Sequence, residues 1–288
     1  MNKFFLWLYP PRNLSSYGEW AIIYNGSYEF ADSICDVLAS RGIKKVVIIN
    51  NEFINHDEDK INKEDENPNI KYSSILQNHY DDTYQCQVLY HDLSTFSLEE
   101  KSKHTFQSKL EYILGTISCD GGIGILVNCI ADHVHPPSSS TTIPSCFFEL
   151  QNKIIKMNPP AIETFLKLQS INQHGVLFTM QSVLPYMRFR ASGAIVMIGS
   201  SSNDSGSCIL ESTKIFGRNL INCMYNEHKN EGIDCLNIML RKIPNYENIG
   251  NKHPDPDDAL KSSQSDEIKN LIDMSLNVLG YQSNISPR

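Results

Sequence analysis

The sequence lacks the features that would mark a membrane-spanning or nucleic-acid-binding protein. No run reaches the roughly 20 apolar residues that a bilayer-spanning helix needs. The apolar start, residues 1–9, ends at Pro10 and Pro11 without the small-residue cleavage site of a signal peptide. Positive charge is not in excess, since 25 Lys and Arg face 33 Asp and Glu for a net charge of −8. We therefore expect no nucleic-acid partner and no polybasic membrane patch. The apolar start remains open as a membrane-proximal foot or a strip packed on the domain.

The cysteines form no recognisable framework. All eight are scattered, no CxxC pair occurs, and several lie inside apolar runs, where a thiol is usually a small buried hydrophobe. A reducing compartment is the simpler interpretation. His133 and His135 flank a single valine without further ligands nearby, so we expect no metal site.

Apolar runs alternate with helical periodicity along most of the chain. This alternation is typical of βαβ units and predicts an α/β fold with a doubly wound parallel sheet in a single domain. The predicted strands and helices are as follows: strands at 20–24, 45–49, 87–90, 124–128, 194–198 and 233–240, and helices at 30–41, 105–117, 161–187, 209–228 and 266–279.

Two segments stand apart from this alternation. Residues 1–16 are expected to form an N-terminal lead-in, and residues 17–288 the α/β domain. Within the domain, residues near 51–85 are polar and rich in acidic side chains. Such a composition buries little apolar surface, so this stretch is predicted to be a solvated insertion.

One stretch concentrates candidate chemistry, running from Gly193 to Lys214. An apolar strand leads through a polar loop that includes Ser200 into a helix that carries Lys214. A hydroxyl and an ammonium can converge in this way at the carboxyl edge of a parallel sheet, where α/β proteins bind their ligands. The alternative is a strand-end cap and a solvated helix lysine.

Several motifs resemble the short-chain dehydrogenase/reductase family. The resemblance is to the branch of very-long-chain 3-oxoacyl-CoA reductases and hydroxysteroid dehydrogenases, and it implies a Rossmann-type fold. It covers roughly residues 10–288. The matching stretches are a lead-in at 11–21, Leu126–Asn128, Leu184–Met187, Gly193–Val196 and Leu279–Tyr281.

The resemblance assigns roles to individual residues. Ser200 matches the serine that hydrogen-bonds the substrate carbonyl, and Lys214 the lysine that holds the nicotinamide ribose. Asn172 matches the asparagine that organises the proton-relay water. Asn172 could instead satisfy a buried carbonyl of its own helix. The positions matching cofactor-binding residues are Gly26, Ser27, Asp92, Asn128 and Lys214. Asp92 could equally cap the turn that follows it.

Two departures from the family pattern affect the chemistry. The family motif Tyr-x-x-x-Lys has Leu210 at the tyrosine position, and a leucine has no proton to donate to an alkoxide. In the glycine-rich turn that accepts a dinucleotide phosphate, the glycine positions are Asn25, Glu29 and Ala31. Asparagine tolerates left-handed backbone, whereas Glu29 places a carboxylate where the phosphate is expected.

Two functions are therefore open. The first is an NADP(H)-dependent reductase of very-long-chain 3-oxoacyl-CoA or steroid-like ketones, in fatty-acid elongation. The second is a catalytically inactive member that keeps the fold as a binding or scaffold protein. The resemblance implies a homodimer and an endoplasmic-reticulum location, and a cytoplasmic location is the alternative.

Overall fold

The computed structural model describes most of the chain. The described residues are 13–26, 28–51, 84–94, 100–130, 148–151, 154–157, 159–200, 208–240, 259–280 and 284–285. The expected lead-in at 1–16 and the polar insertion near 51–85 fall mostly outside these ranges, so both assignments stay predictions.

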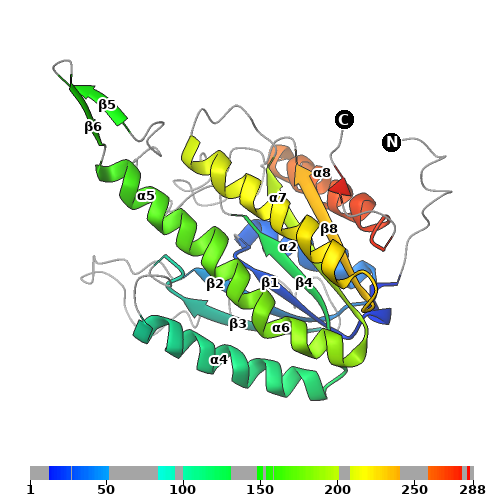
Figure 1. Ribbon diagram of the computed structural model, residues 1–288. Coiled ribbons are helices and arrows are strands. Elements are labelled where there is room, and N and C mark those ends of the chain that lie inside the picture. Colours follow the sequence, from blue (N-terminus) through cyan, green and yellow to red (C-terminus); the bar gives the residue numbers. More distant parts are fainter. Residues whose placement is uncertain are drawn as a thin grey trace, which may run out of the picture.

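A parallel seven-stranded sheet forms the centre of the molecule (Figure 1). Its order is β3-β2-β1-β4-β7-β8-β9, and every pairing within it is parallel. The order reverses between β1 and β4, which is the Rossmann arrangement with its ligand crevice at the switch point. The strands are β1 Trp20–Tyr24, β2 Lys45–Asn51, β3 Gln85–His91, β4 Ile123–Cys129, β7 Gly193–Ser200, β8 Ile233–Leu240 and β9 Asn284–Ile285. The predicted doubly wound α/β fold is confirmed.

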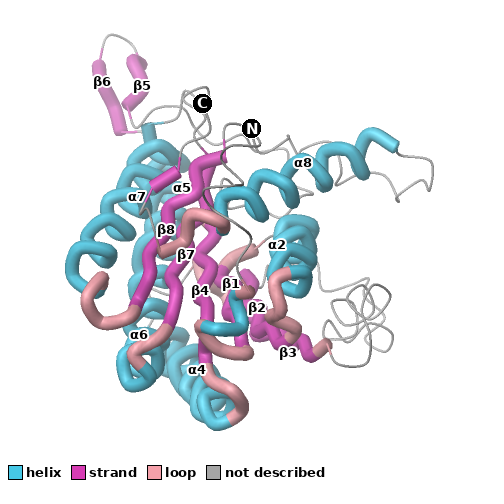
Figure 2. Tube along the Cα trace, turned by 90° about the vertical axis from the view of Figure 1, so that its right-hand side faces the viewer, coloured by secondary structure: helices cyan, strands magenta, loops and turns pink. Residues whose placement is uncertain are grey.

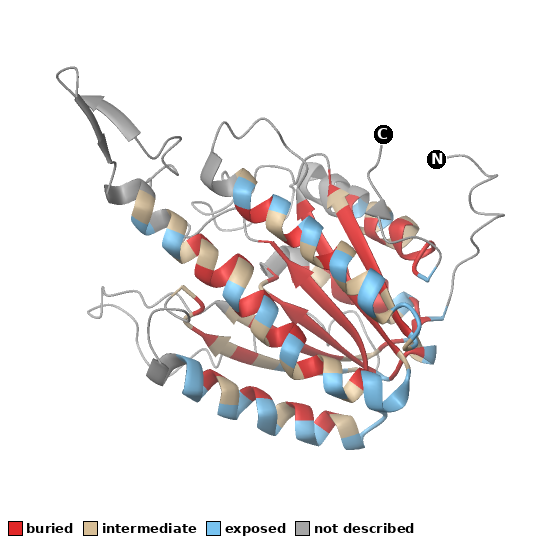
Figure 3. Ribbon diagram, in the orientation of Figure 1, coloured by how far each residue is buried: buried red, intermediate tan, exposed pale blue. Residues whose placement is uncertain are grey.

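Helices cover both faces of the sheet (Figure 2). On one face α2 (Tyr28–Ser40) and α8 (Ala259–Leu276) enclose one apolar core. On the other face α4 (Glu100–Cys119), α6 (Val176–Arg190) and α7 (Cys208–His228) enclose a second core. Strand side chains that alternate between the faces contribute to both cores. The central strands β1 and β4 are accordingly buried along their length, whereas the edge strand β3 is only partly buried (Figure 3).

The segment predicted as one helix at 161–187 is more elaborate. It begins with α5 (Pro159–Gln169), passes through a π-helix η2 (Ser170–Gly175) and continues as α6 to Arg190. Pro185 lies inside α6 and does not end it, so the helix continues to Arg190, beyond the predicted end at 187. The helix ends at Ala191, whose φ of 48° is left-handed. A two-stranded hairpin, β5 (Phe148–Gln151) and β6 (Ile154–Met157), precedes α5 and was not predicted.

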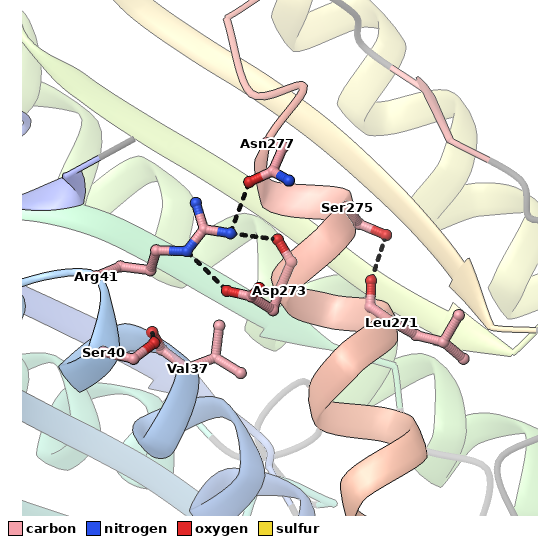
Figure 4. Close-up of polar contacts among 7 residues, drawn as sticks. All are labelled: Val37, Ser40, Arg41, Leu271, Asp273, Ser275 and Asn277. Atoms are coloured by element: carbon pink, nitrogen blue, oxygen red, sulfur yellow. Dashed lines mark hydrogen bonds and ion pairs between the residues drawn. The ribbon is translucent and has the colours of Figure 1, made fainter. Parts of the chain in front are cut away.

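A buried arginine joins the two ends of the domain (Figure 4). Arg41, which follows α2, donates from Nε to Asp273 Oδ1 at 2.7 Å and from Nη2 to Asn277 Oδ1 at 2.6 Å. Its own carbonyl accepts from the backbone N–H of Leu14. The 3-10 turn η1 (Leu14–Ser16), the end of α2 and α8 are thus fixed to one another.

Candidate active site

The turn between β1 and α2 has a left-handed residue at one of the positions where the family has glycine. Asn25 adopts a left-handed φ of 56°, as expected for a residue at a glycine position. Its side-chain Nδ2 donates to the Cys129 carbonyl at 3.2 Å, which ties the ends of β1 and β4 together. At Gly26, a Cβ would come within 3.1 Å of Ala31 and Ile23. Only glycine fits the turn here without a shift.

Two predicted features of this turn lie outside what the structure describes. Ser27 is not among the described residues, and the side chain of Glu29 is not described although its backbone lies in the first turn of α2. The roles assigned to Ser27 and Glu29 therefore remain predictions.

Asp92 caps the turn that follows β3. Its Oδ1 accepts from the backbone N–H of Ser94 at 3.0 Å and from the Ser94 hydroxyl at 2.6 Å. The structure thus shows the capping role that the sequence left open for Asp92. Its role toward a cofactor stays a prediction.

Asn128 is a buried amide without a partner. Its side chain is fully buried, and neither Oδ1 nor Nδ2 has a hydrogen-bond partner among the described residues. It lies near the carboxyl end of β4, in register with Tyr24 of β1 and Met197 of β7. A buried polar group left unpaired costs about 1–3 kcal/mol, so its retention beside the switch point fits a group reserved for function.

Lys214 and Asn172 are placed on two elements that pack together. Asn172, fully buried in the π-helix, donates from Nδ2 to Thr213 Oγ1 at 3.3 Å. Thr213 directly precedes Lys214 on α7. The side chain of Lys214 is 2% exposed. The Lys214 ammonium lies 3.4 Å from Glu211 Oε1, one turn earlier on α7. Asn172 and Lys214, two of the predicted site residues, therefore lie on elements that contact each other, η2 and α7.

Ser200 and Leu210 are placed only by their backbone. Ser200 is the last residue of β7, in register with Leu240 of β8. Leu210 lies in the first turn of α7. Neither side chain is described, so the convergence of Ser200 with Lys214 remains a prediction.

Sequence reasoning missed two residues beside this site. Tyr24 donates its hydroxyl to the Ile171 carbonyl of the π-helix at 2.8 Å, and burial raises the pKa of its phenol, which keeps it a neutral donor. Glu211 contacts Lys214. The (i, i+3) spacing of Glu211 and Lys214 was a readable signal. No local pattern indicated that the buried Tyr24 would reach a helix nearly 150 positions away.

Fold and site together define a doubly wound α/β protein of the Rossmann type. The sheet order, the tight β1–α2 turn and the lysine-bearing helix after β7 lie where such proteins bind dinucleotides.

Comparison with known proteins narrows the class. The profile of the short chain dehydrogenase family matches residues 152–243. Very-long-chain 3-oxoacyl-CoA reductases of Mus musculus and Rattus norvegicus are each 27% identical over 225 residues. The chain is therefore similar to the short-chain dehydrogenase family of oxidoreductases over residues 152–243, and at low identity to these reductases over a longer span.

The curated relatives are longer than the matched part. Each alignment covers 77% of this chain and 58% of the mouse or rat reductase. Among solved structures, a 7beta-hydroxysteroid dehydrogenase superposes with a TM-score of 0.60 at 15% identity, covering 95% of this chain and 89% of its own. Levodione reductase superposes with a TM-score of 0.50 at 18% identity, covering 77% and 70%. These structures support the fold. Within the described part of the chain, no helix is both long and apolar enough to cross a bilayer.

Proposed function

We propose that this protein is an NADP(H)-dependent ketoreductase of long-chain 3-oxoacyl-CoA or steroid-like substrates, with an impaired proton-donating step. The observation that carries the proposal is the buried Lys214 ammonium at the α7–η2 interface. A lysine is rarely buried this fully unless it is paired, because removing its charge from water is costly. Weak similarity to very-long-chain 3-oxoacyl-CoA reductases supplies the substrate class.

The backbone of the β1–α2 turn favours the binding of a dinucleotide, whereas the negative charge of Glu29 opposes it. Asn25 is left-handed, Gly26 leaves little room for a side chain, and Asn128 offers a buried amide at the end of the neighbouring strand β4. Against this, the sequence puts Glu29 at the start of α2, where a phosphate is expected.

Bound NADP(H) would supply the hydride. Gly26, Asn128 and Lys214 would hold it, with Ser27 and Asp92 as further predicted contacts. In the proposed reaction Ser200 polarises the ketone through its hydroxyl. Asn172 fixes α7 through Thr213. Leu210 has no proton to give, so the alkoxide must take its proton from water, and turnover is slow.

A second function is favoured by Leu210 itself. Loss of the acid at this position and a carboxylate in the phosphate turn are independent changes that affect catalysis and cofactor binding separately. A non-catalytic member that keeps the fold as a binding or scaffold protein accounts for both.

Cofactor binding and turnover discriminate between the two functions. NADPH is titrated up to millimolar concentration and followed by its fluorescence and by thermal shift, and its oxidation is then measured with a long-chain 3-oxoacyl-CoA. The reductase proposal predicts saturable binding and slow turnover that Ser200→Ala abolishes. No binding at millimolar NADPH would overturn the reductase and favour the scaffold. Turnover that survives Ser200→Ala would show that the serine is wrongly assigned.

The assembly and location follow as proposals from the same family. The outer faces of α5, α6 and α7 carry the half-exposed apolar side chains Leu166, Leu177 and Ile215, which supports a homodimer through these helices. Light scattering of Leu177→Glu against the wild type tests it. An endoplasmic-reticulum location follows from the resemblance to the reductase branch, with a cytoplasmic location as the alternative, and cell fractionation distinguishes them.

A further inference from the structure

The buried ammonium of Lys214 already has an anionic neighbour within the chain. Glu211 Oε1 lies 3.4 Å from Lys214 Nζ, three residues earlier on the same helix. The exposed fractions of the two side chains differ sharply, at 2% for Lys214 and 29% for Glu211. The carboxylate is therefore the solvent-accessible member of the pair. It compensates a charge that would be costly to bury alone.

A second contact fixes α7, the helix that carries this pair, against the rest of the domain. Thr213 Oγ1 accepts from Asn172 of the π-helix at 3.3 Å, and both residues are fully buried. Gly217, one turn after Thr213, leaves no room for a Cβ, which would lie 2.3 Å from Ile130. With the helix fixed against the sheet, a ligand oxygen that takes the Lys214 ammonium must share it with Glu211 or replace Glu211.

We propose that Glu211 is an internal counter-ion that positions Lys214 and competes with the oxygens of a bound dinucleotide for its ammonium. This inference rests on the proposed cofactor site and deepens it. A negative charge next to the cofactor lysine weakens the binding of a phosphate-bearing dinucleotide by Coulomb repulsion as well as by occupying the ammonium. Glu211 thereby becomes a specificity-determining residue of that site.

The chain offers a matched exposed pair as a control. Glu163 and Lys167 on α5 lie 2.7 Å apart at the (i, i+4) spacing, and their side chains are 68% and 37% exposed. Exposed pairs of this kind contribute little to stability. The two pairs share chemistry and helical context, and they differ in the burial of the lysine.

A double-mutant cycle on thermal unfolding tests the counter-ion. Glu211→Gln leaves Lys214 buried without its carboxylate and should lower the melting temperature by several degrees. Lys214→Met leaves only a part-exposed carboxylate and should lower it less. The double variant should melt higher than Glu211→Gln alone, whereas the same cycle on Glu163 and Lys167 should be additive. Additive effects at Glu211 and Lys214 would overturn the proposal.

Ligand binding provides a readout that a structural role would not move. Titrated with NADPH, Glu211→Gln should bind on the order of tenfold more tightly than the wild type, and Glu163→Gln should bind unchanged. Glu211→Asp, which keeps the charge, should stay near the wild type. Equal or weaker binding by Glu211→Gln would contradict competition. If neither the wild type nor Glu211→Gln binds NADPH, the competition is refuted together with the proposed cofactor. The unfolding cycle then decides the counter-ion independently.

Discussion

In the proposed reaction, Leu210 is the residue that would limit the rate. Hydride addition to a ketone leaves an alkoxide that has to gain a proton, and a positioned acid typically speeds this step by roughly 10²–10⁴-fold. Leu210 lies in the first turn of α7, the helix that carries Lys214, so the proposed site would keep its lysine and lack its acid. Glu29 would act on a different step, the binding of phosphate.

Repair of both positions is expected to restore function. Leu210→Tyr combined with Glu29→Gly should tighten NADPH binding and raise turnover by roughly 10²-fold or more, since the phenol supplies the proton and the phosphate turn loses its negative charge. NADPH oxidation with a long-chain 3-oxoacyl-CoA measures the gain. Leu210→Phe combined with Glu29→Gly is the control, because it adds the ring without the hydroxyl. Equal rates for the two variants would show that the pocket differs from the family's at further positions.

At the scale of elements, the π-helix is the irregular feature next to the site. It contributes buried Asn172, and its carbonyl at Ile171 accepts the Tyr24 hydroxyl. Gly175 ends it directly against that phenol, where a Cβ would lie 1.8 Å from the Tyr24 oxygen. π-turns inside helices occur frequently at functional sites. Here one strand residue fixes the local geometry.

The contact between Tyr24 and Gly175 predicts coupling between two substitutions. Tyr24→Phe should cost about 1 kcal/mol through the lost hydrogen bond. Gly175→Ala should cost about 1–3 kcal/mol through overpacking, and less in the Tyr24→Phe background because the clashing oxygen is gone. Urea unfolding of the wild type, the two single variants and the double variant measures the coupling energy.

Gly115 provides the matched control for that experiment. It lies in the exposed part of α4 with no atom within 4 Å of a Cβ, so Gly115→Ala should stabilise the protein by up to about 1 kcal/mol. Destabilisation by Gly175→Ala that is equal in both backgrounds would contradict the coupling.

At the scale of the whole molecule, Arg41 connects segments that are more than 230 residues apart. The Arg41 side chain is 5% exposed, whereas the Asp273 side chain is 41% exposed. Removal of the guanidinium would therefore free a carboxylate that water can solvate, and the loss would come from the buried hydrogen bonds.

Arg41→Met is expected to destabilise the fold by about 2–3 kcal/mol, because hydrogen bonds to charged groups are worth more than neutral ones. Arg41→Lys should recover only part of this, since an ammonium lacks the planar fork that reaches both partners. Chemical denaturation gives the values. Arg188→Met, at an exposed pair with Glu231, serves as the control and should change stability by no more than about 1 kcal/mol. Equal losses at both sites would refute the role of burial.

The free energy of unfolding should also fall in acid, because of a charge network at the edge of the sheet where β1 and β2 begin. Lys45 and the Trp20 indole hold the pKa of the Asp120 carboxyl below its ordinary value of 3.8. A lowered folded-state pKa stabilises the protein above the unfolded pKa, and this contribution is lost as pH falls through the folded one. Urea midpoints between about pH 5 and pH 2 should therefore drop less steeply for Asp120→Asn than for the wild type. Lys45→Met should flatten the curve as well, and a slope unchanged in both variants would contradict this origin.

The sequence by itself determined the order of strands and helices and the missing acid. Apolar runs and helical periodicity are local properties, so the six main strands and the helix of Lys214 were predicted within a few residues. The chemical consequences of Leu210 and Glu29 were predicted from the sequence alone, because a leucine has no proton to donate and a glutamate carries a negative charge in any fold.

The tertiary structure decided how the residues of the site meet. The π-helix contact of Tyr24 and the burial of Asn128 depend on elements far apart in the chain. The (i, i+3) spacing allowed Glu211 to reach Lys214, but only packing buried the lysine and left its partner accessible. Local sequence fixes which groups are present, whereas burial fixes what their charges cost, and burial arises only when the sheet and helices pack.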